Sequence, residues 1–330
     1  MKKILFLAMA AAAMVSCSQN EEFENAGQQA EVKFGTVVKA GTKAAITTND
    51  NFSEFAVTAY RTTGTMAEVA QLSTVFMPNI AVKQNAGKTA WEYTGTYYWP
   101  LTDKIQFFAT APAQTLAAGA KYPKFDYTIK EVATQEDLVA ANLIDKVKND
   151  GEIIFPFQHL LTQVNFTIKG ATPDFTYTVS KLVIKGAKDK GTFTFDGTAN
   201  VGGWNDQVAS EPAPIYTHEA SVSVAPTTAL PDTEVKLETT GNALFMLMPQ
   251  DLTSVTLDIT YTAAPTDSPS DYTYNNTKTV NLTGTWGMAQ NIRYTLALTT
   301  DASPVKFGTP EVGGWIDTAG TGEAPVTPAN

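Results

Sequence analysis

The residues that could carry chemistry in this chain are few, and the first is its single cysteine. Cys17 is the only cysteine in 330 residues, so a disulfide within the chain and a site built from paired thiols are both excluded. The two histidines, His159 and His218, cannot complete a structural zinc site without cysteine partners. We therefore expect no metal site and no cofactor.

Known catalytic motifs are also missing from the sequence, which has no nucleophile elbow, phosphate loop or zinc-binding helix. The acidic loop from Asp267 to Asp271 does not follow the pattern of a recognised calcium loop. His159 lies beside two leucines, which favours a hydrogen-bonded structural histidine over a catalyst. We therefore expect no catalytic residue and no enzyme. A secreted hydrolase whose triad is assembled from distant positions is the least favoured of the alternatives.

Cys17 ends a segment that is typical of a secretion signal. Residues 1–16 combine two early lysines, an apolar run and a small residue before the cysteine. The apolar run is shorter than the roughly 20 residues that span a bilayer. The stretch Met14–Cys17 resembles the bacterial lipobox, which implies that Cys17 is acylated and becomes the mature N-terminus. The alternative is an ordinary signal peptide followed by a cysteine of no special role.

The residues after the cysteine predict where the protein is displayed. Residues 17–31 are polar and acidic and would form a tether between lipid and fold. The stretch 18–24 resembles the acidic tract that sends lipoproteins of the Bacteroides group to the outer face of the outer membrane, although any solvated tether would have a similar composition. We expect a surface-exposed protein that is attached to the outer membrane through a lipid anchor.

The charge of the chain argues against polyanionic partners. The net charge is −10, and residues 1–16 hold two lysines and no acid, so their loss leaves a mature chain near −12. Nucleic acids and anionic lipid surfaces bind clustered lysine and arginine. We therefore expect no nucleic-acid partner.

Short alternating stretches predict that the chain is all-β. Polar and apolar residues alternate with period two, β-branched residues are abundant, and Gly, Pro, Asn or Asp separate the runs, which is typical of strands. The clearest stretches are 52–60, 164–168, 182–184, 193–195, 222–224, 255–261 and 294–298. Many short strands without helices between them favour a β-sandwich.

One segment, Thr134–Lys148, is predicted to be a helix. Thr134 and Asp137 have the spacing of a capping pair, and Leu138, Ala141 and Leu143 could face a core.

A turn-rich stretch at 169–174 separates two strong strands and predicts a domain boundary. We expect an N-terminal domain over 32–170 and a C-terminal domain over 171–316. Residues 317–330 are rich in Thr, Gly, Pro and Ala and predict a flexible tail.

Several segments, in this order and spacing, resemble the fimbrillin-like proteins of Bacteroidales, a family of type V pilins and related surface lipoproteins. They are residues 98–100, 107–112, 134–140, 155–166, 248–250 and 312–315. The resemblance implies two tandem transthyretin-like β-sandwich domains and assembly by strand exchange after proteolysis. It does not distinguish a shaft subunit from a tip or anchor subunit.

One pentapeptide occurs twice, as Val32–Thr36 and as Val305–Thr309. Each copy places its Val, Phe and Thr on one face of a strand. One copy could therefore replace the other at an open sheet edge, where the added strand satisfies a row of backbone groups. Val32 and Phe34 would belong to the strand that leaves, and Val305 and Phe307 to the strand that enters. The alternative is a chance recurrence in which the second copy, which Pro310 interrupts, pairs within its own domain.

A flexible, basic stretch directly follows the first copy, and such stretches are where proteases cut. In the resembled pilins a trypsin-like protease cuts between a basic residue, usually Arg, and Ala. The matching pair here is Lys43 and Ala44, so a Lys-tolerant protease would be needed. Arg61 is a second candidate, although it follows a strong strand.

Three further features of the sequence bear on packing, binding or modification. The aromatic residues Tyr98, Trp99, Phe107 and Phe108 favour core and interface packing over a ligand platform. The Gly-Gly-Trp sequences that end at Trp204 and Trp315 predict strand ends where backbones approach closely. Asp317-Thr318-Ala319 resembles the O-glycosylation sequence of Bacteroides, which would modify Thr318.

Together these features predict a fimbrial structural or adhesive subunit. It would be exported as a lipoprotein precursor, cut, and joined by strand exchange to like subunits or other pilus subunits, first at the outer membrane and then in the fimbrium. The alternative is a monomeric surface lipoprotein that binds a glycan, a host ligand or another bacterial surface.

Overall fold

The protein is described by a computed structural model. It covers residues 30–38, 51–117, 120–171, 174–198, 201–210, 215–224, 233–237, 243–267, 273–300, 305–307 and 310–314. The predictions for Cys17, Lys43, Ala44 and Thr318 lie outside these residues, as do the predicted signal peptide and tail.

The fold is all-β, as predicted. Each strand predicted from alternation overlaps an observed strand. Two short 3-10 turns lie among the strands, η1 (Val132–Thr134) and η2 (Lys148–Asp150). Across the described part of the chain, no helix has the length and hydrophobicity that a membrane span requires.

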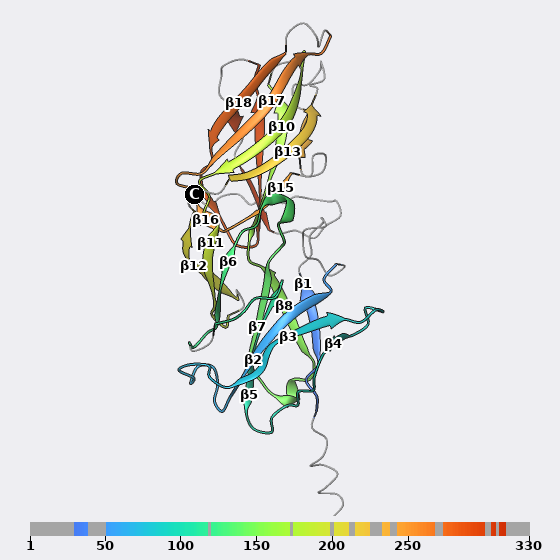
Figure 1. Cartoon of the computed structure of the whole chain (residues 1–330), viewed down its shortest axis with the longest axis vertical. Helices are drawn as coiled ribbons and strands as arrows, with labels where there is room; N and C mark the ends of the chain where they lie inside the picture. The colour runs from blue at the N-terminus through green and yellow to red at the C-terminus, as the bar shows by residue number, and fades with distance from the viewer. Residues whose placement is uncertain are drawn as a thin grey trace, which may run out of the picture.

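The first sheet has seven strands from the first half of the chain, in the order β1-β8-β7-β5-β2-β3-β4. Figure 1 shows it at the lower end of the molecule. β1 runs parallel to β8, and the other neighbours are antiparallel. The strands are β1 (Phe34–Val38), β2 (Glu54–Thr62), β3 (Val75–Gln84), β4 (Trp91–Tyr93), β5 (Lys104–Ala111), β7 (Val139–Lys146) and β8 (Ile153–His159).

Both faces of the central strands β2, β5 and β7 are buried. One face contributes to a core rich in phenylalanine, here called the aromatic core, which includes Phe34, Phe52, Phe55, Phe107, Phe155 and Phe157. The other face contributes to a larger core, here called the main core, through side chains such as Tyr60 and Phe108. Successive residues of one strand therefore enter different cores, which is why these strands contain nearly continuous apolar runs.

The remaining strands form four further sheets, of which the four-stranded one lies at the upper end in Figure 1. The three-stranded sheet has the order β12-β11-β6, the four-stranded sheet β13-β10-β17-β18, and the two-stranded sheet β16-β19. The six-stranded sheet runs β14-β9-β20-β21, with β15 paired to β9 and β22 paired to β20. Side chains from all four sheets contribute to the main core. The strands are β6 (Lys124–Thr128), β9 (Thr162–Gly170), β10 (Phe175–Lys185), β11 (Lys190–Phe195), β12 (Gly202–Val208), β13 (Ile215–Val224), β14 (Val235–Lys236), β15 (Leu244–Leu247), β16 (Gln250–Asp251), β17 (Thr256–Pro265), β18 (Tyr274–Asn281), β19 (Thr285–Trp286), β20 (Gln290–Leu298), β21 (Lys306–Phe307) and β22 (Glu311–Gly314).

The predicted helix at Thr134–Lys148 is wrong. The segment forms the end of η1 and then β7, which lies between β5 and β8. Residues 139–142 are buried on both faces, so they show no alternation of apolar and polar residues. A short apolar run of this kind fits a buried strand as well as a helix, and here the pairing with β5 decides.

The sheets do not follow the predicted domain boundary at residue 170. β9 ends there, yet its partners β14, β15 and β20 all come from later in the chain. β6, from the first half, pairs with β11 from the second half. The division into two tandem transthyretin-like domains at this position stays a prediction, and the sheet pairing crosses it in both directions.

The Gly-Gly-Trp sequence at 202–204 lies at the start of β12. Gly202 has φ of +151°, and a Cβ at this position would lie 2.2 Å from the backbone oxygen of Thr194. The close approach of backbones predicted beside Trp204 is therefore present. The second such sequence reaches β22, but Trp315 lies outside the described residues.

We expect that truncating Phe108 destabilises the whole fold, because its ring joins the two halves of the chain. The ring centroid lies 5.1 Å from that of Phe195 in β11 and 6.2 Å from that of Tyr60 in β2. Phe108→Ala should lower the free energy of unfolding by about 3–5 kcal/mol. Urea denaturation followed by circular dichroism measures this value. Leu101→Ala, at a side chain that is 91% exposed, is the control and should change it by less than about 0.5 kcal/mol. Equal effects of the two substitutions would contradict the assigned packing.

Candidate functional site

The first described segment, residues 30–38, contains β1, which forms one edge of the seven-stranded sheet. The sheet curls so that its two edge strands, β1 and β4, come close together. Along β1, Phe34 is paired in register with Ile153 of β8. Val32 is 0% exposed and Phe34 is 2% exposed, so this edge strand is inserted into the fold and does not merely lie on it.

Phe34 is surrounded by aromatic rings from four other strands. Its ring centroid lies 6.2 Å from that of Phe55, 5.5 Å from Tyr93, 6.0 Å from Phe107 and 5.6 Å from Phe155. The Phe55 and Phe107 contacts are edge-to-face, and the Phe155 contact is stacked. Aromatic pairs in these geometries contribute about 0.5–1.5 kcal/mol each beyond the area they bury. Phe34 is therefore the side chain that anchors β1.

Backbone hydrogen bonds fasten the start of this segment to the chain that follows β4. The N–H of Val32 donates to the carbonyl of Tyr97 at 2.9 Å, and the N–H of Trp99 donates to the carbonyl of Ala30 at 3.0 Å. The phenol of Tyr93 donates to the carbonyl of Val32 at 2.7 Å. The first described residues are thus held from both sides, by β8 and by residues 93–99.

The Tyr93 phenol keeps its proton over a wide pH range. Burial, followed by the negative charge of Glu31, whose carboxylate lies 3.4 Å from the phenol oxygen, raises its pKa to about 12. The phenol is therefore neutral at physiological pH and can donate to Val32.

The position of β1 determines what its removal would uncover. Loss of β1 would leave the edge of β8 unpaired along five register positions, from Ile153 to Phe157. It would also expose the pockets that Val32 and Phe34 fill. An extended segment with apolar residues at alternate positions would restore both the backbone pairing and the buried side chains.

The C-terminal copy of the pentapeptide lies on a different sheet. β21 pairs antiparallel with β20, where Lys306 is opposite Ala297 and Phe307 is opposite Leu296. Val305 is buried. Pairing within its own chain, the alternative raised from the sequence, is therefore what this structure contains. The two copies differ in partner and in strand direction.

The two candidate cut sites differ in their surroundings. Lys43 and Ala44 lie outside the described residues, five and six positions after the end of β1 at Val38. Arg61 lies within β2, in register with Ile105 of β5, and its N–H donates to the carbonyl of Thr74.

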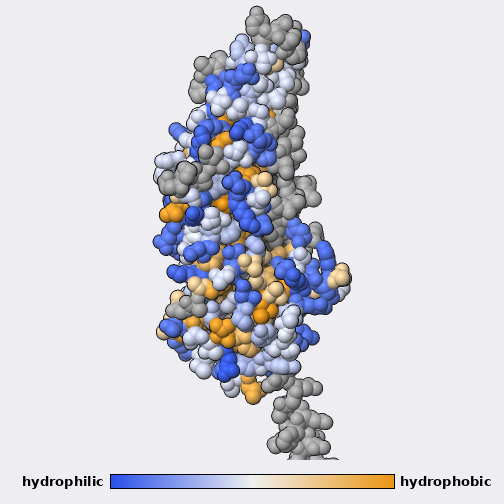
Figure 2. Space-filling model, viewed as in Figure 1, coloured by the Kyte–Doolittle hydropathy of each residue, from blue (hydrophilic) through white to orange (hydrophobic). Residues whose placement is uncertain are grey.

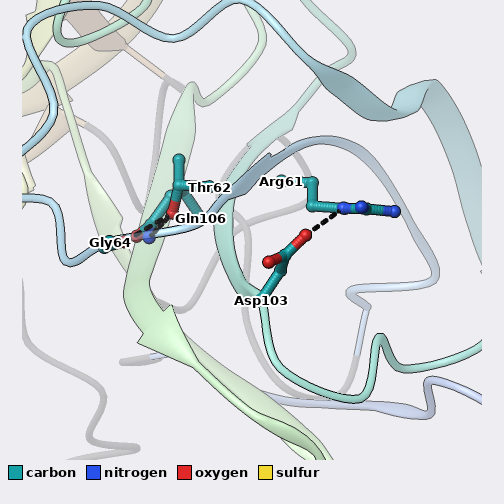
Figure 3. Close-up of polar contacts among 5 residues, drawn as sticks. All are labelled: Arg61, Thr62, Gly64, Asp103 and Gln106. Atoms are coloured by element: carbon teal, nitrogen blue, oxygen red, sulfur yellow. Dashed lines mark hydrogen bonds and ion pairs between the residues drawn. The ribbon is translucent and has the colours of Figure 1, made fainter.

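Figure 3 shows the side chains around Arg61. Its guanidinium forms an ion pair with Asp103, and the neighbouring Thr62 accepts a hydrogen bond from Gln106 at 2.9 Å. Thr62 in turn donates to the carbonyl of Gly64 at 2.8 Å. A protease binds its substrate as an extended, separated segment, so cleavage at Arg61 would require the sheet to open. The structure disfavours Arg61 as a processing site.

The aromatic residues singled out in the sequence are packing residues with one exception. Trp99, Phe107 and Phe108 are buried, and Tyr98 is 45% exposed. His159 is buried and its Nδ1 lies 2.8 Å from Asp137 Oδ2. The predicted hydrogen bonding of His159 is confirmed.

Several residues of the site were missed from the sequence. Tyr93, Phe55 and Phe155 surround Phe34, yet none was predicted to do so. The alternation Ile153, Phe155, Phe157 was a usable signal for an inward-facing strand, whereas nothing local marks Tyr93. Among the described residues no cluster of His, Cys, Asp or Glu could hold a metal ion.

In Figure 2, hydrophilic residues cover much of the visible surface, and hydrophobic ones gather toward the lower end, over the seven-stranded sheet. The exposed large hydrophobic residues of this sheet and its loops include Val75, Tyr98, Leu101 and Ile154. The site of β1 therefore belongs to the end of the molecule that carries more exposed apolar surface in this view.

The sequence matches the model of one protein family over residues 39–315, and this family is described as fimbrillin-like. No curated protein matches the sequence at a significant level.

Solved structures share the fold. A protein from Bacteroides ovatus ATCC 8483, proposed to act in cell adhesion, aligns with a TM-score of 0.55 and 14% identity, over 88% of this chain and 99% of that chain. A protein of the same description from Bacteroides uniformis ATCC 8492 aligns with a TM-score of 0.51 and 18% identity, over 86% of this chain and 99% of that chain. At these identities the likeness extends to the fold alone.

We expect alkaline pH to loosen the β1 segment through Tyr93. In the folded state the pKa of Tyr93 is raised to about 12 from an ordinary value of about 10. The stabilisation that the protonated phenol gives to the β1 segment is therefore fully present below pH 10 and is lost as the pH rises through 12. Hydrogen exchange of residues 30–36, measured between pH 9 and 12, should accelerate beyond the intrinsic base-catalysed rate.

Tyr93→Phe is the matched control, because it lacks the titrating phenol. It should exchange faster than the parent at pH 9 and show no further pH-dependent step near 12. An ultraviolet difference spectrum of parent minus variant should show one tyrosine titrating near 12. Titration near pH 10 would contradict the buried, hydrogen-bonded phenol.

Proposed function

This chain belongs to the fimbrillin-like family, and we propose that it is a pilus subunit whose β1 strand is exchanged for a strand of a neighbouring subunit. Membership of the family supports a fimbrial or adhesive role, a position at the cell surface and association with other pilus subunits. The role proposed is structural and adhesive, without catalysis.

The proposed pathway begins with export as a lipoprotein precursor. Cys17 receives the lipid, and residues 17–31 hold the protein at the outer face of the outer membrane. Cleavage between Lys43 and Ala44 then separates β1 from the rest of the chain. The segment Val305–Thr309 of another subunit fills the vacated site, and the chain passes from the membrane into the fimbrium.

The observation that carries the proposal is the position of β1. The strand that immediately precedes the predicted cut is an edge strand, it is anchored by two buried side chains, Val32 and Phe34, and its pentapeptide recurs near the C-terminus. Because β1 is an edge strand, it can leave without breaking the pairing between any other two strands.

The entering segment must leave its own sheet first. Release breaks the pairing of β21 with β20, and insertion beside β8 would restore the pairing that β1 makes there.

One observation favours the alternative of a monomeric surface lipoprotein that binds a glycan, a host ligand or another bacterial surface. Both copies of the pentapeptide are paired within the same chain, so the edge of β8 stays occupied until β1 is removed. Without cleavage the protein would remain a monomer, and processing therefore decides between the two functions.

We expect Lys43→Gln to prevent assembly, because the cleavage that frees β1 needs a basic residue. N-terminal sequencing and mass measurement of protein from the native cell surface should show a chain starting at Ala44 in the parent and at lipidated Cys17 in the variant. A gel in mild denaturant should show a ladder of polymers for the parent alone. Lys39→Gln is the control and should leave the ladder intact. A ladder formed by the Lys43→Gln chain would contradict the assigned cut.

We expect Phe307→Asp to weaken polymers without unfolding the monomer. In the exchanged state Asp would replace an aromatic ring in the pocket that Phe34 occupies, and burial of an unpaired carboxylate is strongly unfavourable. The ladder should be lost in milder denaturant, while the monomer Tm stays close to the parent value. Leu101→Asp introduces the same charge at an exposed loop and should leave the ladder unchanged. Polymers of parent strength in the Phe307→Asp chain would contradict the donor assignment.

A further inference from the structure

A hollow of about 400 Å³ lies between the two edge strands of the seven-stranded sheet. Its walls include Lys33 and Phe34 from the β1 segment, Trp91 and Glu92 from β4, and Glu152 from the turn before β8. The proposed exchange does not account for this space, because it exists while β1 is still in place.

Two unpaired backbone edges face each other across the hollow. β1 and β4 are the two end strands of the sheet and are not paired with each other. The carbonyl of Lys33 accepts from the N–H of Ile153 in β8 at 2.8 Å, so the backbone groups of the next residue, Phe34, point the other way, toward β4.

The same alternation applies to β4. The N–H of Asn85 donates to the carbonyl of Ala90 at 3.0 Å, on the side of β3. Trp91, one residue later, therefore directs its backbone groups away from β3 and toward β1. The donors and acceptors of Phe34 and Trp91 can thus both be reached from within the hollow.

The space between β1 and β4 is closed at one end and open at the other. At Val32 the gap is closed, since its N–H donates to Tyr97 and its carbonyl accepts from the phenol of Tyr93. At Phe34 and beyond, no strand among the described residues pairs with β1 on that side. A strand could therefore enter at the open end and meet the closed end at Val32.

The side chains of the hollow suit a particular extended segment. The lining includes two aromatic residues, the buried Phe34 and the half-buried Trp91. It also includes a rim of exposed charged residues, which are Glu31, Glu92, Glu152 and two lysines. A strand that fits would direct apolar residues inward and a cation outward. The sequence Val305-Lys306-Phe307 has this pattern.

We propose that this hollow is the entry point at which the C-terminal segment of a second copy docks before β1 leaves. The segment first adds to the open edges beside Phe34 and Trp91, and it then replaces β1 residue by residue toward Val32. This inference rests on the proposed strand exchange and specifies its first step.

Stepwise replacement of β1 by the entering strand is physically favoured over a pathway in which β1 leaves before that strand binds. Departure would uncover Val32, Phe34 and the surrounding aromatic rings at once and would break every pair with β8 before any is regained. Entry through the hollow keeps most of these contacts at each step.

The test uses the mature chain with a specific protease sequence inserted between Lys43 and Ala44, cut in vitro with β1 still bound. A fluorescent peptide of residues 303–309 with capped ends, in which Lys306 is the charged side chain, serves as the entering segment, and release of labelled β1 is followed over time. If the hollow is the entry point, the exchange rate rises linearly with peptide concentration. A rate independent of peptide concentration means that β1 leaves first, which overturns the entry step and leaves exchange intact.

Reversing the charge of two glutamates at the rim of the hollow tests whether the entering segment binds there first. The double variant Glu92→Lys and Glu152→Lys should slow exchange at least tenfold at low salt, with a smaller effect on the stability of the final complex. Glu219→Lys, an exposed glutamate on β13, is the control and should exchange at the parent rate. A double variant that exchanges at the parent rate overturns the hollow as the entry point. If the peptide does not bind even after β1 is separated in denaturant and the chain is refolded, strand exchange itself fails, and this inference fails with it.

Discussion

The structure depends on one constraint, which is that the central strands of the seven-stranded sheet, β2, β5 and β7, carry buried side chains on both faces. Phe107 enters the aromatic core and Phe108, the next residue, enters the main core. The main core continues through every sheet formed by the later strands, so the sheet that holds β1 is supported from behind by the rest of the molecule. Polar groups reinforce this support. The backbone N–H of Met246 donates to the side chain of Gln135 at 2.8 Å in a buried environment.

The aromatic core explains why an edge strand can be both secure and removable. Phe34 is held by ring contacts on several sides, but its strand is hydrogen-bonded as a strand on one side only. The partner strand β8 tolerates Pro156 because Ile153 donates toward β1, and alternation then directs the nitrogen of Pro156 away from β1. The pairing of β1 with β8 therefore requires no donor from the proline. Strong side-chain anchoring combined with a single backbone partner is the combination that replacement by a similar strand requires.

Several buried polar groups hold neighbouring elements of the fold together. His159 and Asp137 join the end of β8 to the turn before β7. Gln106 binds Asp145 at 2.9 Å, and Asp145 accepts from the N–H of Met66 at 2.7 Å, which fastens the loop after β2. By contrast, the charged residues at the rim of the hollow surround an open space between two strand edges. This geometry supports the proposed docking of an extended segment.

The sequence by itself determined the strand-rich character of the chain, the positions of the clearest strands and the duplicated pentapeptide, because side-chain alternation and residue identity are local properties. It could not identify β7, since a strand buried on both faces has no alternation and Val139–Asn142 fits a helix equally well. Nor could it place the sheet boundaries, because β9 and β6 find their partners across the predicted division. Only the tertiary structure decided that Phe34 is surrounded by rings from β2, β4, β5 and β8, and that a hollow remains between β1 and β4. Contacts between residues that are distant in sequence depend on how the sheet curls, and no local pattern encodes that curvature.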